Sequence, residues 1–275
     1  MKRLASTATF LFAVALLAPP LLRAQADDIP SAAPAQPSGK TDTQQGHTLL
    51  NEMVTALGGQ AWLNRTSIHI EGRTAAFFQG QPNLSETQFR EDIRLPASGQ
   101  PRADRIGFLT DRGVIIPGKK VDVIQVYSDG KGIETTYKGQ TPLPKEQVAE
   151  YYLLQKHSIE SIVHTWLKAP GVMVVYEGAA MVERHIADTV SVLAADNDTV
   201  TLELDASTHL PLRLSFQTRN EQFHDLDQDS ETFDDYHAIQ RIQTPLTITH
   251  YHNGQIANQR FLTAVVYNLP HDPAY

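Results

Sequence analysis

Cysteine is absent from this chain of 275 residues. Without it the protein can form no disulfide bond, present no cysteine nucleophile and carry no lipid-modified cysteine at a cleavage site. Its stability must therefore come from an ordinary apolar core. The length is ample for one, because a chain of about 250 residues buries roughly three quarters of its unfolded surface.

Basic residues are scarce, with 23 Lys and Arg against 31 Asp and Glu. Three of the basic residues, Lys2, Arg3 and Arg23, lie in the first 26 positions, so the rest of the chain carries a net charge of about −11 with histidine neutral. No basic run interrupts this excess of acid. The balance argues against nucleic acid and against anionic lipid head groups as partners.

Apolar runs of the roughly 20 residues that cross a bilayer are also missing after residue 26. The first residues instead follow the order of an export signal. Lys2 and Arg3 form a basic start, Phe10–Ala18 an apolar run, and Ala24-Gln25-Ala26 a small-residue cleavage site. We expect the segment 1–26 to be removed as a signal peptide. The sequence thus predicts an exported, soluble protein without a lipid anchor.

The next segment, 27–45, is rich in Ala, Pro, Ser and Gln and has no apolar periodicity. Such a composition cannot bury enough surface to offset its ordering entropy, so it predicts a flexible linker. A helix should follow, because Leu50, Met53 and Leu57 repeat at helical spacing before Gly58-Gly59, a typical helix end. We expect residues 46–275 to form a single domain.

From Thr66 onward the apolar period changes to two. The short, regular spacing of these segments, with Gly, Pro and Asn between them, predicts an antiparallel meander rather than alternating strands and helices. The predicted strands cover about 66–78, 84–94, 103–111, 121–128, 132–138, 172–178, 182–194, 198–205, 210–218, 231–239, 244–252 and 256–267.

A helical insertion should interrupt the strands between Pro144 and Pro170-Gly171. Pro144 can open its first helix and Ser158 can cap its second. The second helix has the strongest helical pattern of the mature chain, with apolar residues at Ile159, Ile162, Val163, Trp166 and Leu167.

The last two strands form the clearest hairpin of the sequence, because Asn253-Gly254 is a preferred type I′ loop. A two-residue loop predicts the register of the flanking strands. We expect His252 opposite Gln255, His250 opposite Ala257, and Leu246 opposite Phe261.

Six short motifs follow one another in an order that resembles the LolA-like superfamily, and in particular its outer-membrane-lipoprotein-sorting-protein-like branch from Gram-negative bacteria. None is specific alone, and their order and spacing carry the resemblance. They are Leu57-Gly58-Gly59; Leu63, Ser67 and Gly72; Ser128-Asp129-Gly130; Val182-Glu183-Arg184-His185; the segment Leu204–Arg213; and Phe233-Asp234-Asp235-Tyr236 with Thr244-Pro245.

This resemblance implies a mainly β (α+β) fold: a strongly curved antiparallel sheet, an incomplete or half β-barrel, with helices covering its concave face. It also implies a periplasmic location and a groove between sheet and helices that holds acyl chains or an apolar partner segment. A dry groove of this kind can bind an acyl chain, since buried apolar area contributes about 25 cal/mol per Å². The candidate walls are Phe77, Phe78, Phe89, Phe108, Tyr151, Tyr152, Leu154, Trp166 and Leu167. Plain core packing is the alternative interpretation of these residues.

His250-Tyr251-His252 is the sharpest polar pattern, because alternate strand positions point the same way and two imidazoles could reach one metal. A third ligand would have to come from a residue such as His224, His237 or Asp235. The alternative is that both histidines lie at a strand end beside the turn.

Asp225, Asp227 and Asp229 resemble a calcium loop but lack its Gly and Glu, and therefore predict a solvated acidic loop.

The sequence has no G-x-S-x-G elbow, and no P-loop or dinucleotide motif follows a strand. The leading hypothesis is therefore a monomeric, non-enzymatic periplasmic protein without a cofactor, whose partner is a lipid or a lipoprotein. One alternative is an envelope sensor or interaction module that binds a segment of another protein. A less favoured one is a metal-dependent enzyme that uses His250 and His252.

Overall fold

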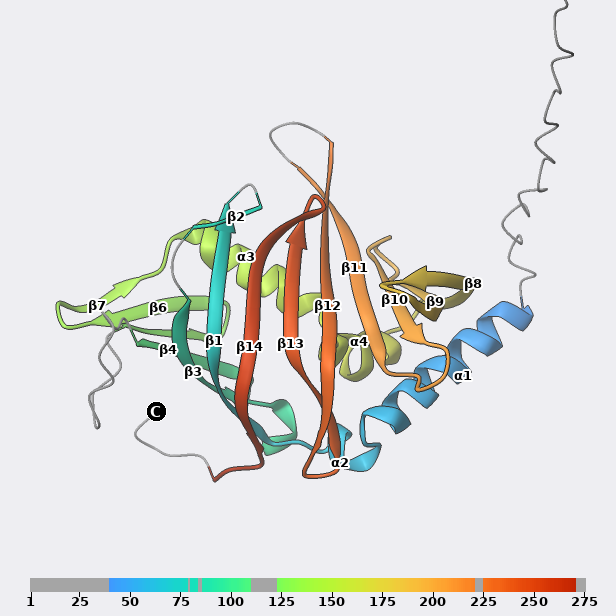
Figure 1. Ribbon diagram of the computed structural model, residues 1–275, viewed down its shortest axis with the longest axis horizontal. Coiled ribbons are helices and arrows are strands. Elements are labelled where there is room, and N and C mark those ends of the chain that lie inside the picture. The colour runs from blue at the N-terminus through green and yellow to red at the C-terminus, as the bar shows by residue number, and fades with distance from the viewer. Residues whose placement is uncertain (1–39, 79, 84–85, 110–122, 221–224, 271–275) are drawn as a thin grey trace, which may run out of the picture. The chain divides into compact units, whose positions relative to one another are not determined.

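The computed structural model describes residues 40–78, 80–83, 86–109, 123–220 and 225–270 (Figure 1). The predicted signal peptide and most of the predicted linker lie outside these ranges. The helices of the described part are α1 (Lys40–Leu57), α2 (Gln60–Leu63), α3 (Lys145–Lys156) and α4 (Ile159–His164), with short 3-10 turns at Pro96–Ser98 and Trp166–Lys168.

In the described part of the chain, fourteen strands make up one sheet. They are β1 (Ser67–Phe78), β2 (Gln81–Pro82), β3 (Thr87–Arg94), β4 (Ala103–Leu109), β5 (Val123–Ser128), β6 (Lys131–Thr136), β7 (Gly139–Pro142), β8 (Met173–Val182), β9 (His185–Leu193), β10 (Thr199–Asp205), β11 (Pro211–Arg219), β12 (Leu226–Ile239), β13 (Ile242–His252) and β14 (Gln255–Tyr267).

The strand order is β7-β6-β5-β4-β3-β1-β14-β13-β12-β11-β10-β9-β8, with β2 paired to β1 outside this path. All the paired strands are antiparallel, and β7 and β8 are the two ends of the order, so the sheet does not close into a barrel. Figure 1 shows the central strands upright and the strands at both ends running across them. The predicted mainly β class and antiparallel meander are confirmed.

Two local details follow directly from the sequence. Helix α1 ends at Leu57, and Gly58 and Gly59 after it both have positive φ, 132° and 56°. A side chain at Gly58 would place its Cβ 2.6 Å from the carbonyl oxygen of Arg241, so this glycine also lets the helix end approach the β12–β13 turn. At α4, the Ser158 hydroxyl accepts a hydrogen bond from the Ser161 amide at 3.2 Å, as the predicted cap requires.

The predicted register of the last hairpin is correct only next to the turn. His252 does pair with Gln255, but a β-bulge between His250 and Tyr251 shifts the rest of the ladder by one residue. His250 therefore pairs with Asn258, and Phe261 pairs with Thr247. This shift of one residue places Leu262 rather than Phe261 in the core, and a second register shift, between β1 and β14 at Glu71 and Gly72, lets Val265 enter the same core.

Three other sequence expectations need correction at element boundaries. Helix α1 begins at Lys40, within the range assigned to the linker. Strands β2 and β7 have no counterpart among the predicted strands, since both are short and carry no apolar alternation. Strand β12 begins at Leu226, so Asp227 and Asp229 lie in a strand and not in a loop.

The main core joins helices and sheet in one cluster. Leu50 and Met53 of α1 and Ile162 of α4 are almost fully buried in it, and side chains from β1, β3, β8–β11, β13 and β14 complete it. We call the sheet face that carries Ile70, Leu202 and Leu262 of this core the inner face. Helices α3 and α4 lie behind the central strands in Figure 1. That the inner face is the concave one stays a prediction.

Among the residues that the structure describes, we find no helix with both the length and the hydropathy needed to span a bilayer.

Candidate functional site

A cavity of about 380 Å³ lies against four adjacent strands of the sheet, and we call it the inner cavity. Its volume falls at the lower end of the roughly 300–1,000 Å³ that is usual for ligand pockets. Each of β1, β3, β4 and β14 contributes two residues at alternate positions. The described lining residues are Thr74, Ala76, Thr87, Phe89, Ile106, Phe108, Asn258 and Arg260.

The strand register explains why these side chains meet. Phe89 pairs with Phe108 on one side, and Thr74 pairs with Thr87 and with Arg260 on its two sides. Phe89 itself lies opposite Gly72. A Cβ at Gly72 would lie 3.0 Å from Phe89 Cε1 and would overlap the backbone of β14, so the glycine makes room for the ring that forms the cavity wall.

One wall of the inner cavity is apolar and the other polar. Phe89, Ile106 and Phe108 supply the apolar surface. On the polar side, the Asn258 side-chain amide donates a hydrogen bond of 2.9 Å to the Thr74 hydroxyl. The Arg260 guanidinium lies 4.6 Å from the centroid of the Phe89 ring and forms an ion pair with the buried Glu91. This combination can accommodate a ligand with an apolar chain and a polar end.

A second buried ion pair continues the polar side toward helix α3. Arg102 contacts Asp104 at 2.8 Å, and the Tyr151 hydroxyl donates a hydrogen bond to the same carboxylate. The Tyr151 ring stacks on Tyr127 with 3.8 Å between ring centroids. Burial raises the pKa of both Asp104 and Tyr151 above their ordinary values. These contacts attach α3 to β4 and β5 beside the inner cavity.

His250 and His252 both contact the carboxylate of Asp229. Nε2 of His250 and Nδ1 of His252 each lie 3.0 Å from Oδ1 of Asp229, which is buried. Although burial acts to raise it, the hydrogen bonds from both imidazoles hold the pKa of Asp229 below its ordinary value. The expectation of a solvated acidic loop is thus wrong for Asp229, because two histidines compensate its burial.

The described residues contain no group of three or more His, Cys, Asp and Glu that could hold a metal ion. Of the suggested third ligands, His237 lies 3.0 Å from Asp235 at exposed positions on β12. His224 lies outside the described residues.

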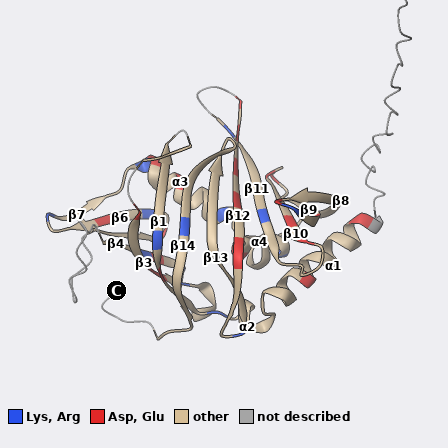
Figure 2. Cartoon of the chain, viewed as in Figure 1, with Lys and Arg blue, Asp and Glu red and all other residues tan. Residues whose placement is uncertain are grey.

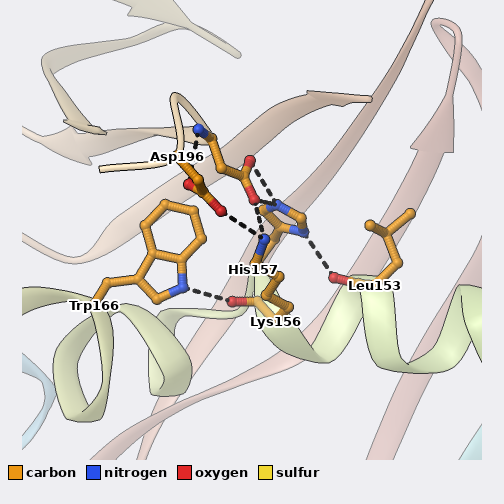
Figure 3. A network of polar contacts seen from close by, with 6 residues as sticks. Leu153, Lys156, His157, Trp166 and Asp196 are labelled. Atoms are coloured by element: carbon orange, nitrogen blue, oxygen red, sulfur yellow. Dashed lines mark hydrogen bonds and ion pairs between the residues drawn. The ribbon is translucent and has the colours of Figure 1, made fainter. Parts of the chain in front are cut away.

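Sequence reasoning missed a third polar network, at the junction of α3 and α4 (Figure 3). His157 is buried, stacks on Phe216 at 3.9 Å, and lies within 3.0 Å of both carboxylate oxygens of Asp198. Lys156 forms an ion pair with the same carboxylate, and the Trp166 indole donates to the Lys156 carbonyl oxygen at 3.1 Å. A single histidine at a helix end carries no sequence signal of such a role.

The structure brings together only part of the predicted groove. Phe89 and Phe108 line the inner cavity. Phe77 and Phe78 lie at the far end of β1, where they pair with Pro82 and Gln81 of β2, and Phe78 is 67% exposed.

The helical candidates lie elsewhere. Tyr151 binds Asp104, and the Tyr152 hydroxyl donates to the Lys131 carbonyl oxygen at 3.1 Å. Trp166 is buried in the core, and Leu154 and Leu167 pack against it. None of these five residues is among the described lining of the inner cavity.

A further cavity of about 350 Å³ lies beside α2 and the β12–β13 turn. Two of its amide side chains already bond the backbone: Gln240 bonds both the amide and the carbonyl of Tyr267, and Asn268 accepts from the Thr66 amide at 2.8 Å. The described lining of this further cavity is Gln60, Ala61, Asn64, Gln240, Arg241, Ile242 and Asn268. We therefore favour the inner cavity as the candidate site.

Solved structures share this architecture. A domain from Vibrio parahaemolyticus, provisionally named an outer membrane lipoprotein-sorting protein domain, superposes with a TM-score of 0.56 at 11% identity, over 84% of this chain and 96% of its own. A DUF1329 family protein from Desulfovibrio piger superposes with a TM-score of 0.57 at 12% identity, over 85% and 96%. The chain shares the fold of these two proteins. The predicted resemblance is confirmed at the level of the fold.

A LolA superfamily protein from Nitrosomonas europaea aligns over 82% of this chain and 94% of its own, with 11% identity and a TM-score of 0.47. No family model matches the sequence, and no curated protein matches it. At identities this low, similarity establishes a common fold and leaves function to be argued from the site.

Proposed function

We propose that this chain is a periplasmic, non-enzymatic protein that binds an apolar ligand, the acyl chain of a lipid or of a lipidated partner, in the inner cavity. The observation that supports this most is the cavity itself, with Phe89, Ile106 and Phe108 on one side and hydrogen-bonding groups on the other. Each methylene transferred from water to such a surface contributes about 0.8 kcal/mol, so a short chain suffices for binding.

The position of the cavity refines the predicted groove. Ile162 and Trp166 of the α4 region are buried in the core, as are Leu50 and Met53 of α1. That part of the space between helices and sheet is therefore filled. The proposal assigns the ligand to the neighbouring region over β1, β3, β4 and β14. The fold that this chain shares with a provisionally named lipoprotein-sorting domain also favours a binding role.

A variant that fills the cavity tests the proposal. Ala76 is an exposed cavity residue, so Ala76→Trp should occupy the site without disturbing the core. Delipidated protein would be titrated with a fluorescent fatty acid and a fluorescent acylglycerol. We expect saturable binding of at least one probe, weakened at least tenfold in Ala76→Trp.

Arg73→Trp is the matched control, because it adds the same indole three residues away on β1, at an exposed position outside the cavity lining. It should bind as the wild type does. Absence of saturable binding to either probe, or equal loss in both variants, would contradict the proposal. Mass spectrometry of organic extracts from natively purified protein would then identify the class of ligand.

A further inference from the structure

The inner cavity contains a cation whose charge is already neutralised. Arg260 is the only charged residue among the described lining residues, and Glu91 of β3 forms an ion pair with it. Glu91 is 4% exposed and the Arg260 side chain is 30% exposed, so this partly buried pair is screened less than a surface pair. The ion pair as a whole therefore carries no net charge.

More carboxyl groups surround this pair. Glu231 of β12 is close enough to Arg260 for their charges to interact, and Asp104 of β4 interacts in the same way with Glu91. Burial raises the pKa of Glu231 and of Asp104. Figure 2 shows acidic positions along β12, which β13 separates from β14.

Two basic side chains balance these flanking carboxyls, and both are engaged. Arg102 contacts Asp104 at 2.8 Å, and His250 interacts with Glu231 while bonded to Asp229. Among the residues that the structure describes, the surroundings of Arg260 therefore contain no surplus positive charge for a further anion. A negative head group brought here would lose part of its hydration and meet the carboxylate of Glu91 beside Arg260.

The remaining polar groups of the lining are neutral. Thr74, Thr87 and Asn258 supply hydroxyls and a carboxamide, which both donate and accept hydrogen bonds. The one described hydrogen bond from the Arg260 guanidinium uses Nη2 alone, while the group has five N–H donors. Such a set suits a carbonyl or hydroxyl oxygen.

We propose that Glu91, by neutralising Arg260, makes the inner cavity select amphiphiles with a neutral, hydrogen-bonding head group, an ester or an alcohol, over those with a free carboxylate. This inference rests on the proposed function and names the ligand class of the same site. Glu91 acts through Arg260 and is a specificity-determining residue.

Three probes of equal chain length test this proposal: dodecanoic acid, methyl dodecanoate and 1-dodecanol, each displacing a fluorescent acylglycerol at pH 8, where the acid is ionised. We expect the ester and the alcohol to bind the wild type at least tenfold more tightly than the acid. The affinity for the acid should rise at least tenfold in Glu91→Gln, because Arg260 is no longer neutralised. Ester affinity should change less than threefold.

Glu71→Gln is the matched control. Glu71 of β1 forms an ion pair with Arg90 of β3, at 2.7 Å, at partly exposed positions outside the cavity lining. This variant should leave all three affinities unchanged. The double variant Glu91→Met/Arg260→Met replaces the pair by apolar side chains of similar volume, a change that proteins often tolerate. It should still bind the ester and should show no gain for the acid.

Equal wild-type affinity for acid and ester would overturn the selectivity while leaving the proposed function intact. An unchanged acid affinity in folded Glu91→Gln would also overturn it. Should Glu91→Gln fail to fold, the wild-type comparison of acid with ester decides by itself. Failure of all three probes to bind would instead count against the proposed function.

Discussion

Gly72 has no side chain at the point where β1 passes the ring of Phe89, and a Cβ there would contact that ring at 3.0 Å. Gly72→Ala should lower the free energy of unfolding by about 1–3 kcal/mol, because overpacking forces neighbouring groups out of place. Denaturant unfolding measures the change. Probe affinity should fall with it, since Phe89 is a wall of the inner cavity.

Ala264→Val is the control for this substitution. Ala264 is exposed on β14, where it pairs with Glu71 beside the same stretch of β1. A β-branched residue fits an exposed strand position, so stability should change by less than about 0.5 kcal/mol. Equal stability of Gly72→Ala and the wild type would show that the close approach at Gly72 is unimportant.

His250 should titrate above the usual range of histidine. Burial acts to lower its pKa, but the hydrogen bond to Asp229 and the charges of Glu231, Asp229 and Glu150 raise it above the reference value of 6.5. A raised pKa means that the imidazolium stabilises the fold at low pH, and that this contribution is lost as the pH rises through the folded-state pKa.

Asp229→Asn should therefore lower the pKa of His250, which histidine resonances in NMR spectra can follow. The wild type should lose part of its stability advantage over this variant as the pH rises through that pKa. Asp235→Asn, beside the exposed His237, is the control and should leave His250 unchanged. An unaltered His250 titration in Asp229→Asn would contradict the assignment.

At the scale of elements, the α3–α4 junction is held to the sheet by one buried histidine. His157 stacks on Phe216 of β11 and bonds Asp198, in the turn between β9 and β10. Asp198→Asn should cost about 1–3 kcal/mol of stability, because hydrogen bonds to a charged group are among the stronger ones. Hydrogen exchange should increase in the peptides that cover α3 and α4.

Asp196→Asn is a control in the same turn (Figure 3), since Asp196 is 66% exposed and lies 3.8 Å from Lys156. It should change stability by less than about 0.5 kcal/mol. Burial acts to raise the pKa of Asp198, but the hydrogen bonds from Lys156 and His157 lower it below its ordinary value. The difference in the free energy of unfolding between wild type and Asp198→Asn should therefore have its full size at neutral pH. It should disappear as the pH falls below about 3.8.

Local elements could largely be predicted, and for a common reason. The Gly58-Gly59 helix end, the Ser158 cap and the Asn253-Gly254 turn depend on the conformational preferences of a few adjacent residues. The bulge at His250–Tyr251 could not be predicted in this way. Bulges depend on how β13 fits both of its neighbours, and the one-residue shift moved Phe261 to the other face of the sheet.

For the whole molecule, residues 1–26 should direct export. When the full chain is expressed in a Gram-negative host, we expect the periplasmic fraction released by osmotic shock to hold a protein that begins near Asp27. Intact-mass measurement checks the new N-terminus. Replacing Lys2 and Arg3 by glutamate should slow processing and retain the longer chain in the cells. An uncleaved chain in the periplasmic fraction would contradict the expectation.

The candidate site shows where prediction from sequence ends. Phe89 and Phe108 stand out as aromatic residues in adjacent strands, and both line the inner cavity. Arg260 and Asn258 lie some 185 positions from Thr74 and Ala76, their partners in the β1–β14 ladder. No sequence pattern within either strand predicts that the two strands pair. The cavity exists only because distant strands become neighbours.

The acidic character, the mainly β class, most turns and the prediction of an export signal follow from the amino-acid sequence alone, because each depends on composition or on residues a few positions apart. Tertiary structure decided which side chains share the inner face, that two histidines hold Asp229, and that Glu91 neutralises Arg260. These features need strands separated by up to about 190 residues to be paired in one register. Register is set by the packing of the whole sheet, which local sequence does not encode.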